Sequence, residues 1–367
     1  MEANGPKRYR LSAVLTRRGI TGLALVASAV VGGGAAFVYT AGWLSPGRLS
    51  QGRVVDRLEQ VYGRHPGFRR NHAKGVCFSG AFESSGAAQS LSAAAVFKPG
   101  PTPVFGRFAL AGGQPYMADT PTAVRSMAVD FELKDGEVWR TGINNIPVFP
   151  VRDVRGFYAQ LAATRPDPRT GNPDPARVAR FLAANPETGR AMALIKAQPP
   201  TSGFADSTYN SLDAFRFINA AGASTPVRWS MIPEDPVRPP PPGAKPADRN
   251  ALFDELVARV RRGPVHFRLV VTAANSGDPT NDATKPWPAD RRRVEAGVLT
   301  ITQVQDEDHG ACRDVTFDPL ILPHGIAPSD DPLLSARSAT YAQSFTRRAG
   351  EPRPTLPVRI SPQAASP

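Results

Sequence analysis

Proline and glycine divide this chain into short segments, and this feature restricts its fold more than any other. The 367 residues include 38 prolines and 32 glycines, and both residue types interrupt helices. Between residues 75 and 153, apolar and β-branched runs alternate with breaks that contain Gly or Pro, a pattern typical of successive strands joined by turns. A bundle of long helices is therefore excluded, and a β-rich fold is expected.

The residue pattern predicts strands in two groups. The first group is 76–82, 94–98, 104–111, 123–133, 138–141 and 148–152. The second group is 215–219, 227–232, 266–272 and 298–304. Apolar residues at helical spacing predict helices at about 47–63, 175–197, 248–262 and 331–348. Eight or more antiparallel strands with short hairpins, followed by helices, indicate an α+β fold built on a closed barrel with helical additions.

The N-terminal segment differs from the rest of the chain in charge and hydropathy. Residues 1–18 carry five basic residues against Glu2, and residues 19–44 carry no charge. About 20 apolar residues span a bilayer as a helix, and flanking cations stay on the cytoplasmic side. We therefore expect a basic cytoplasmic N-terminus at 1–18, a transmembrane anchor at 19–44, and the remainder on the periplasmic side. Arg17-Arg18 also resembles a twin-arginine signal, so an exported soluble periplasmic protein stays an alternative.

Charge and cysteine content narrow the partners. The net charge of +12 invites a nucleic-acid partner, but the basic residues are scattered and no nucleic-acid-binding motif accompanies them, so none is expected. The sequence has two cysteines, Cys77 and Cys312, and it leaves open whether they pair in an exported chain. A zinc enzyme is not expected, because neither a CxxC nor a His-x-x-x-His motif occurs.

The last predicted helix carries a stripe of reactive side chains. Arg337 and Tyr341 are four residues apart and share a face. Arg348 follows Arg337 by eleven residues, or about three turns plus 20°, and falls on the same stripe. A free phenol ionises near a pKa of about 10, and an adjacent guanidinium or a ferric ion stabilises its phenolate. Taken alone, such a pattern is more often an exposed arginine stripe with an ordinary tyrosine.

Three separated motifs give this stripe a context. Arg69–Gly75 reads R-x-x-H-A-K-G, Asn144–Phe149 reads N-N-x-P-x-F before Arg152-Asp153, and Arg337-x-x-x-Tyr341 follows. In this order, over residues 65–350, they make the chain resemble the catalase superfamily, in particular the short catalase-related peroxidases. The resemblance implies a catalase-like eight-stranded barrel with haem b, and its iron, as the cofactor.

The resemblance also implies roles for individual residues. Tyr341 would be the axial iron ligand, and Arg337 would keep it anionic. His72 would move the peroxide proton from the near to the far oxygen, with a pKa near the operating pH. Asn144 would orient the bound peroxide. The residues expected to bind haem are Arg69, Arg107 and Arg348 at the propionates, with Phe149, Phe157 and Phe317 against the ring.

Some positions depart from the family pattern. A serine that normally supports the distal histidine is Ala109 here, which leaves the orientation of His72 less supported. A valine that narrows the peroxide channel corresponds to Ala111, and a channel aspartate corresponds to Ser126. These changes indicate a wider channel that admits a larger peroxide. Only 26 residues follow Tyr341, so we expect a monomer or loose oligomer.

The sequence therefore predicts a catalase-like haem domain at 47–350, followed by a flexible tail at 351–367. The expected activity is a haem-dependent peroxidase that reduces hydrogen peroxide or organic hydroperoxides through a ferryl intermediate. Its electrons would come from a small-molecule donor, and catalase activity would be weak or secondary. Two alternatives remain open: a hydroperoxide isomerase or dehydratase on the same fold, and a non-enzymatic haem-binding barrel.

Overall fold

The computed structural model of the protein describes residues 49–134, 136–240 and 249–361. The basic segment at 1–18 and the expected transmembrane segment at 19–44 lie outside these residues. None of the helices in the described part of the chain combines the length and the hydropathy of a membrane-spanning helix.

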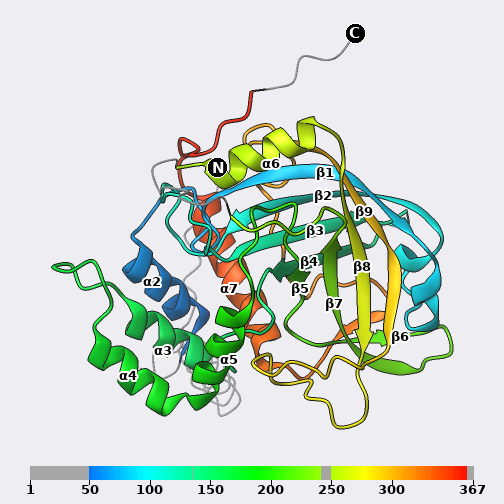
Figure 1. Ribbon diagram of the computed structural model, residues 1–367, viewed down its shortest axis with the longest axis horizontal. Helices are drawn as coiled ribbons and strands as arrows, with labels where there is room; N and C mark the ends of the chain where they lie inside the picture. Colours follow the sequence, from blue (N-terminus) through cyan, green and yellow to red (C-terminus); the bar gives the residue numbers. More distant parts are fainter. Residues whose placement is uncertain (1–48, 135, 241–248, 362–367) are drawn as a thin grey trace, which may run out of the picture. The chain divides into compact units, whose positions relative to one another are not determined.

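Within the described residues, eight antiparallel strands close into a barrel (Figure 1). In order around the barrel they are β1 (Gly75–Ser84), β2 (Gly100–Leu110), β3 (Arg125–Glu132), β4 (Val138–Asn144), β5 (Tyr209–Asn210), β7 (Ser224–Pro233), β8 (Val265–Ala273) and β9 (Arg293–Gln305). The pairing of β9 with β1 completes the ring. Two short strands, β6 (Phe215–Ile218) and β10 (Ile326–Pro328), extend the sheet beyond β7. The predicted closed antiparallel barrel is thus confirmed.

The barrel interior is packed with large aromatic side chains. Along β4 every second residue is buried, and the residues between them face outward, as the two-residue period of a strand requires. Trp139 stacks on Phe131 with 4.7 Å between ring centroids and meets Trp229 edge-on at 5.2 Å. Because side chains fill the inside of a barrel of this size, a ligand site is expected on the outer face of the strands.

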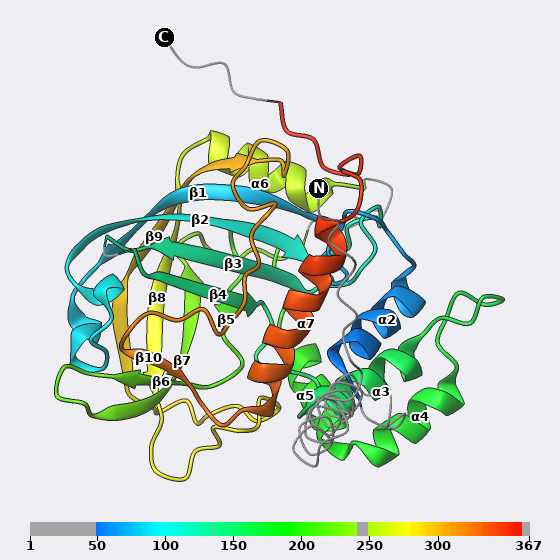
Figure 2. The same ribbon diagram turned by 180° about the vertical axis from the view of Figure 1, so that it is seen from behind.

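Helices cover part of that outer face. They are α2 (Gln51–Tyr62), α3 (Val154–Thr164), α4 (Pro175–Ala184), α5 (Pro186–Ala197), α6 (Ala251–Arg261) and α7 (Pro332–Ala349). Figures 1 and 2 show α7 lying along the barrel, with α2 to α5 grouped beside it. The Asp331 side chain caps α7 by accepting a hydrogen bond from Leu333 N at 2.9 Å, and Pro332 occupies the first turn, both favourable choices at a helix start.

The structure differs from the predicted secondary structure at three places. Residues 94–98 are not a strand but contain a short 3-10 helix, Ala95–Phe97. Residues 148–152 form a loop that leads into α3, a helix the strand prediction missed. The single helix expected at 175–197 is two helices that meet at Asn185-Pro186, because proline lacks an N–H and disfavours a helical residue before it.

A disulfide joins Cys77 on β1 to Cys312 in the loop after β9. This answers the pairing that the sequence left open. Both cysteines are buried and pack with Phe317. The disulfide therefore fixes the loop that precedes Phe317 to the first strand of the barrel.

Residues 351–361 are the described part of the expected C-terminal tail, and they contact the domain. Leu356 and Val358 are buried. Glu351 accepts hydrogen bonds from Gly67 N at 2.7 Å and from the buried guanidinium of Arg70. The tail thus packs over the segment that leads to His72.

Candidate active site

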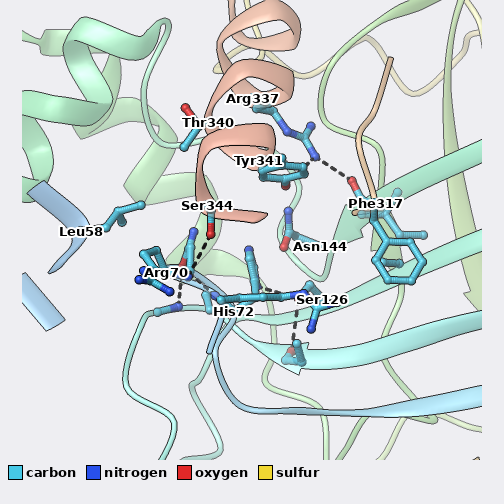
Figure 3. A pocket seen from close by; sticks show the side chains of 18 of the residues that line it. Leu58, Arg70, His72, Ser126, Asn144, Phe317, Arg337, Thr340, Tyr341 and Ser344 are labelled. Carbon is cyan, nitrogen blue, oxygen red and sulfur yellow. Dashed lines mark hydrogen bonds between the residues drawn. The ribbon is translucent and has the colours of Figure 1, made fainter. Parts of the chain in front are cut away.

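A cavity of about 370 Å³ is lined by residues of β2, β3 and β4 on one side and of α7 on the other. Figure 3 shows Tyr341 of α7 on one side of it, and His72 with Ser126 on the opposite side. The structure brings every predicted site residue to this cavity: Arg69, His72, Arg107, Asn144, Phe149, Phe157, Phe317, Arg337, Tyr341 and Arg348. Residues spread over more than two thirds of the chain therefore form one site.

On the α7 side, Arg337 lies between Tyr341 and a carboxylate. Its Nη2 donates to Tyr341 Oη at 3.5 Å and to the Gly142 carbonyl at 3.1 Å, and its Nη1 pairs with Asp213. Burial lowers the pKa of Arg337, but the charges of Tyr341 and Asp213 outweigh it and raise this pKa above its ordinary value. The guanidinium is thus a permanent cation beside the phenol, as the helical spacing predicts.

His72 has an unusual backbone. Its φ is 55°, in the left-handed region that non-glycine residues rarely adopt. The Asn71 side chain holds the turn by accepting hydrogen bonds from His72 N at 3.0 Å and Gly112 N at 2.8 Å. Arg107 donates to the His72 carbonyl at 2.8 Å. Strained residues persist where their surroundings fix them in this way, often at functional sites.

The glycine that ends the first motif is needed for this arrangement. A Cβ on Gly75 would lie 2.4 Å from the Arg107 guanidinium carbon and 2.5 Å from the Phe108 carbonyl oxygen. Glycine at this position therefore lets the buried Arg107 side chain pass across β1 and reach the carbonyl of His72.

The ring of His72 has a hydroxyl partner that the sequence did not predict. Ser126 Oγ lies 2.8 Å from His72 Nδ1. Ser126 of β3 is the direct partner of Ala109 on β2 and of Asn144 on β4, so these three side chains stand in one row across the sheet. The expected lack of support for His72 is therefore wrong, because the neighbouring strand supplies a hydroxyl that Ala109 lacks.

The charge state of His72 also differs from expectation. Burial, together with the guanidiniums of Arg107, Arg337 and Arg69, lowers its pKa to about 3. The prediction of a pKa near the operating pH is wrong for this environment. At neutral pH the ring is a neutral imidazole, which can accept a proton but holds it only weakly.

Arginines gather at one edge of the cavity around a buried carboxylate. Glu307 Oε1 accepts from Arg69 Nη1 at 2.6 Å and from Arg107 Nε at 2.9 Å. Burial raises the pKa of Glu307, but Arg107 and Arg69 lower it further and leave it below its ordinary value. Arg348 completes the group and donates to the Arg313 carbonyl. Three guanidiniums and one carboxylate give a net charge of 3 − 1 = +2.

The sequence did not predict the contacts that three residues make in the site: Asp213, Glu307 and Ser126. Asp213 and Glu307 belong to no motif, and nothing in their spacing connects them with Arg337 or Arg69. For Ser126, the direction of the side chain could have been predicted. It lies two residues before Ala128 and one after buried Arg125 in an alternating strand, so strand periodicity directs it outward.

Comparison with known proteins places these residues in a family. The family model described as Catalase matches residues 40–366. The chain belongs to the catalase family. It is 35% identical over 312 residues to the catalase-related peroxidase of Synechococcus elongatus, covering 85% of this chain and 92% of that protein. It is 33% identical over 311 residues to the catalase-related peroxidase of Mycolicibacterium paratuberculosis, covering 84% of this chain and 97% of that protein.

Solved catalases share the fold. A fungal catalase superimposes with a TM-score of 0.71 at 19% identity, covering 84% of this chain. Catalase A from Saccharomyces cerevisiae gives a TM-score of 0.70 at 21% identity, covering 81% of this chain. The chain spans 64% of the length of each of these two catalases. At this identity the likeness shows the common barrel and helices.

The residues that line the cavity of this catalase-family chain have the chemistry to hold a haem group. Phe149 and Phe157, with ring centroids 6.2 Å apart, and Phe317 provide apolar walls, as a flat macrocycle requires. The net charge of +2 at the arginine edge matches two propionates. Tyr341 offers iron a phenolate oxygen. Arg107 is engaged at all three of its nitrogens with Glu307, His72 and Ala73, so its share in binding a propionate is its charge.

Proposed function

We propose that the protein is a haem b-dependent peroxidase that reduces hydrogen peroxide or an organic hydroperoxide. The overall reaction is ROOH + AH₂ → ROH + H₂O + A, where AH₂ is a small-molecule electron donor. The observation that carries the proposal is one cavity in a catalase-family chain with Tyr341 and Arg337 on one side and His72 and Asn144 on the other. Relatives described as catalase-related peroxidases support a peroxide-acting oxidoreductase.

The chain's own residues divide the work of proton transfer and orientation. Neutral His72 accepts the proton of the peroxide oxygen nearer the cofactor and returns it to the farther oxygen, which leaves as water or an alcohol. Because the low pKa of His72 disfavours the imidazolium, the return of the proton is favourable. Asn144, beside Ser126 at the end of β4, directs an amide toward the peroxide. Haem, when bound, supplies the electrons that cleave the O–O bond.

Features of the cavity support a peroxidase that accepts larger peroxides. The lining includes Ala111 and also Val54, Leu58 and Tyr62 of α2. Figure 3 places Leu58 at the margin of the pocket. These side chains make an apolar surface for the organic group of a hydroperoxide. The ferryl route and a weak or secondary catalase activity are parts of this proposal.

We extend the proposal to location. The basic segment 1–18 and the uncharged segment 19–44 favour a membrane-anchored protein whose catalytic domain is periplasmic; an exported soluble protein is the alternative. The Cys77–Cys312 disulfide supports an oxidising compartment, because disulfides are rare in the cytosol. A monomer or loose oligomer remains the expected assembly.

Reconstitution with haem tests the proposed function. The purified full chain should develop a Soret band with haem b. It should then oxidise an electron donor in step with peroxide loss, with both hydrogen peroxide and tert-butyl hydroperoxide. Oxygen release from hydrogen peroxide measures the catalase reaction and should be minor. Absence of a Soret band would refute haem binding, and peroxide conversion without donor consumption would favour an isomerase or dehydratase.

A further inference from the structure

Ser126 is placed to define the state of the His72 ring. Its Oγ lies 2.8 Å from His72 Nδ1 and 3.3 Å from the carbonyl oxygen of Ala109. A serine hydroxyl has one proton to donate and can accept from another group, whereas a carbonyl oxygen only accepts. The two contacts of Ser126 are therefore satisfied together when its own proton goes to Ala109.

This arrangement favours the histidine nitrogen as the donor. With the hydroxyl proton directed to Ala109, Ser126 Oγ accepts from Nδ1–H, and a chain runs from Nδ1–H through Oγ–H to the carbonyl. Each proton then has one acceptor. A neutral imidazole carries one proton, so Nε2 keeps its lone pair. The second ring nitrogen is thereby left as the base.

The backbone of His72 is already fixed, which makes the ring the remaining variable. The left-handed turn is held by Asn71 and by Arg107, and these contacts do not determine how the imidazole is rotated. A hydrogen bond to one ring nitrogen fixes both the rotation and the tautomer. Ser126 is the side chain that makes this bond.

The position of the hydroxyl can be exchanged within the sheet. Ala109 and Ser126 are direct partners on β2 and β3, so their side chains lie on the same face. Both line the cavity beside His72. A hydroxyl at position 109 would therefore face the same cavity as the hydroxyl of Ser126.

We propose that Ser126 is the positioning residue of His72: it holds the ring as the Nδ1–H tautomer, with Nε2 as the proton acceptor for the peroxide. This inference rests on the proposed peroxidase function for its kinetic consequence, but the tautomer is a property of the protein by itself. It assigns to Ser126 a role other than the channel position expected from the sequence.

Three variants of the full chain test the kinetic consequence. Ser126→Ala removes the hydroxyl and should lower kcat/KM for hydrogen peroxide by about tenfold to a hundredfold, as loss of such an orienting partner does. The Soret band and the half-saturating donor concentration should not change. The double variant Ala109→Ser/Ser126→Ala returns the hydroxyl across the β2–β3 pair and should restore kcat/KM to within about threefold of the wild type. Ser90→Ala, on an exposed turn, is the matched control.

Nitrogen NMR tests the tautomer without relying on turnover. Ring-¹⁵N-histidine protein is loaded with diamagnetic zinc protoporphyrin IX, and the His72 signals are assigned by their loss in His72→Gln. At neutral pH the wild type and the double variant should show a protonated Nδ1 and an unprotonated Nε2. Ser126→Ala should show a mixture of tautomers.

The outcomes separate this inference from the proposed function. A wild type with no peroxide turnover refutes the peroxidase, while the NMR result still decides the tautomer. Protonated Nε2 in the wild type overturns the inference. So does a Ser126→Ala variant within twofold of wild-type kcat/KM, or a double variant that folds and binds haem yet remains as slow as Ser126→Ala.

Discussion

The two sides of the cavity are built in different ways. On the side of α7, which we call proximal, Arg337, Tyr341 and Arg348 come from a single helix. On the opposite side, which we call distal, His72 precedes β1, and Ser126 and Asn144 belong to β3 and β4. Helix geometry fixes the first set from spacing alone, whereas the second set depends on the register of three strands. The proximal residues could therefore be placed on one face from the sequence, whereas strand periodicity indicates only the outward direction of Ser126 and not its contact with His72.

The two sides also differ in charge. Arg337 is a half-buried cation balanced by Asp213, and its field acts on Tyr341. His72 is held neutral by burial and by surrounding guanidiniums. The proximal side is thus suited to stabilise an anionic ligand, and the distal side is suited to exchange a proton. Substitutions on the two sides should separate cofactor binding from turnover.

The largest effect is expected from Tyr341→Phe. Without the phenol oxygen, iron loses the ligand that the cavity offers, so the Soret band should weaken or shift and peroxidase activity should disappear. Absorption spectra and donor oxidation measure the two effects. Tyr116→Phe is the control, since Tyr116 is exposed and bonds only a C-terminal backbone carbonyl. An unchanged spectrum would remove Tyr341 as the iron ligand.

His72→Ala should give the contrasting result. Loss of the proton-transfer group is expected to lower kcat/KM for peroxide by about 10²- to 10⁴-fold, while the Soret band is retained. The control is His324→Ala, at an exposed position. If activity survived, the assigned proton shuttle would be wrong. If haem were lost together with activity, the division between the two sides would fail.

Glu307→Gln tests the arginine edge of the cavity, where Glu307 pairs with Arg69 and Arg107. Arg69 and Arg107 would lose the negative charge of their buried partner, and breaking a buried ion pair typically costs about 3–5 kcal/mol. The haem-free variant should therefore unfold at lower denaturant concentration than the wild type. Bound propionates should offset part of this loss, so the haem-loaded variant should be affected less. Equal losses in both forms would separate Glu307 from the cofactor; Glu83→Gln, an exposed position on β1, is the control.

The smallest effect is expected in the pH dependence of kcat/KM, which should change little near neutral pH. Because His72 has a pKa of about 3 in the folded protein, kcat/KM should stay level from pH 8 to about 4 and fall only in stronger acid. A profile with its midpoint near the ordinary histidine pKa of about 6.5 would contradict the neutral state of the ring.

The same pKa difference predicts the direction of the stability change. The folded pKa of His72 is lowered, so the unfolded chain binds more protons between about pH 6.5 and 3. This contribution to stability is present above the unfolded pKa and is lost as the pH falls toward the folded one. As the pH falls from about 6.5 to 3, denaturant unfolding should show a larger loss of stability for the wild type than for His72→Gln.

Much of the fold could be predicted from local sequence pattern, and the wrong predictions have physical reasons. The barrel strands and α7 show clear hydrophobic periodicity, and Asp331-Pro332 indicates where α7 begins. Residues 148–152 are as apolar as a strand, yet they form a loop whose Phe149 N donates to the carbonyl of Ala283. The α3 helix was signalled by Asp153, which caps it through Gly156 N at 2.8 Å, but the apolar run before it suggested a strand.

The parts of the site that escaped the sequence all depend on long-range pairing. Glu307 meets Arg69 and Arg107 from a loop after the last barrel strand, and Asp213 meets Arg337 from the loop after β5. Motifs identify residues that act in the reaction, because the chemistry restricts their type. Partners that balance charge can come from any nearby loop, so spacing does not reveal them.

The Cys77–Cys312 disulfide makes most of the barrel a closed covalent ring. The ring encloses Arg107, Ser126 and Asn144, while His72 and Tyr341 lie on the two arms that leave it. A protease cut anywhere between the cysteines would open the ring but leave both arms joined in one molecule. Such a nicked protein should migrate as a single species until a reductant is added. The disulfide is thus a covalent link between the bases of the two arms that carry His72 and Tyr341.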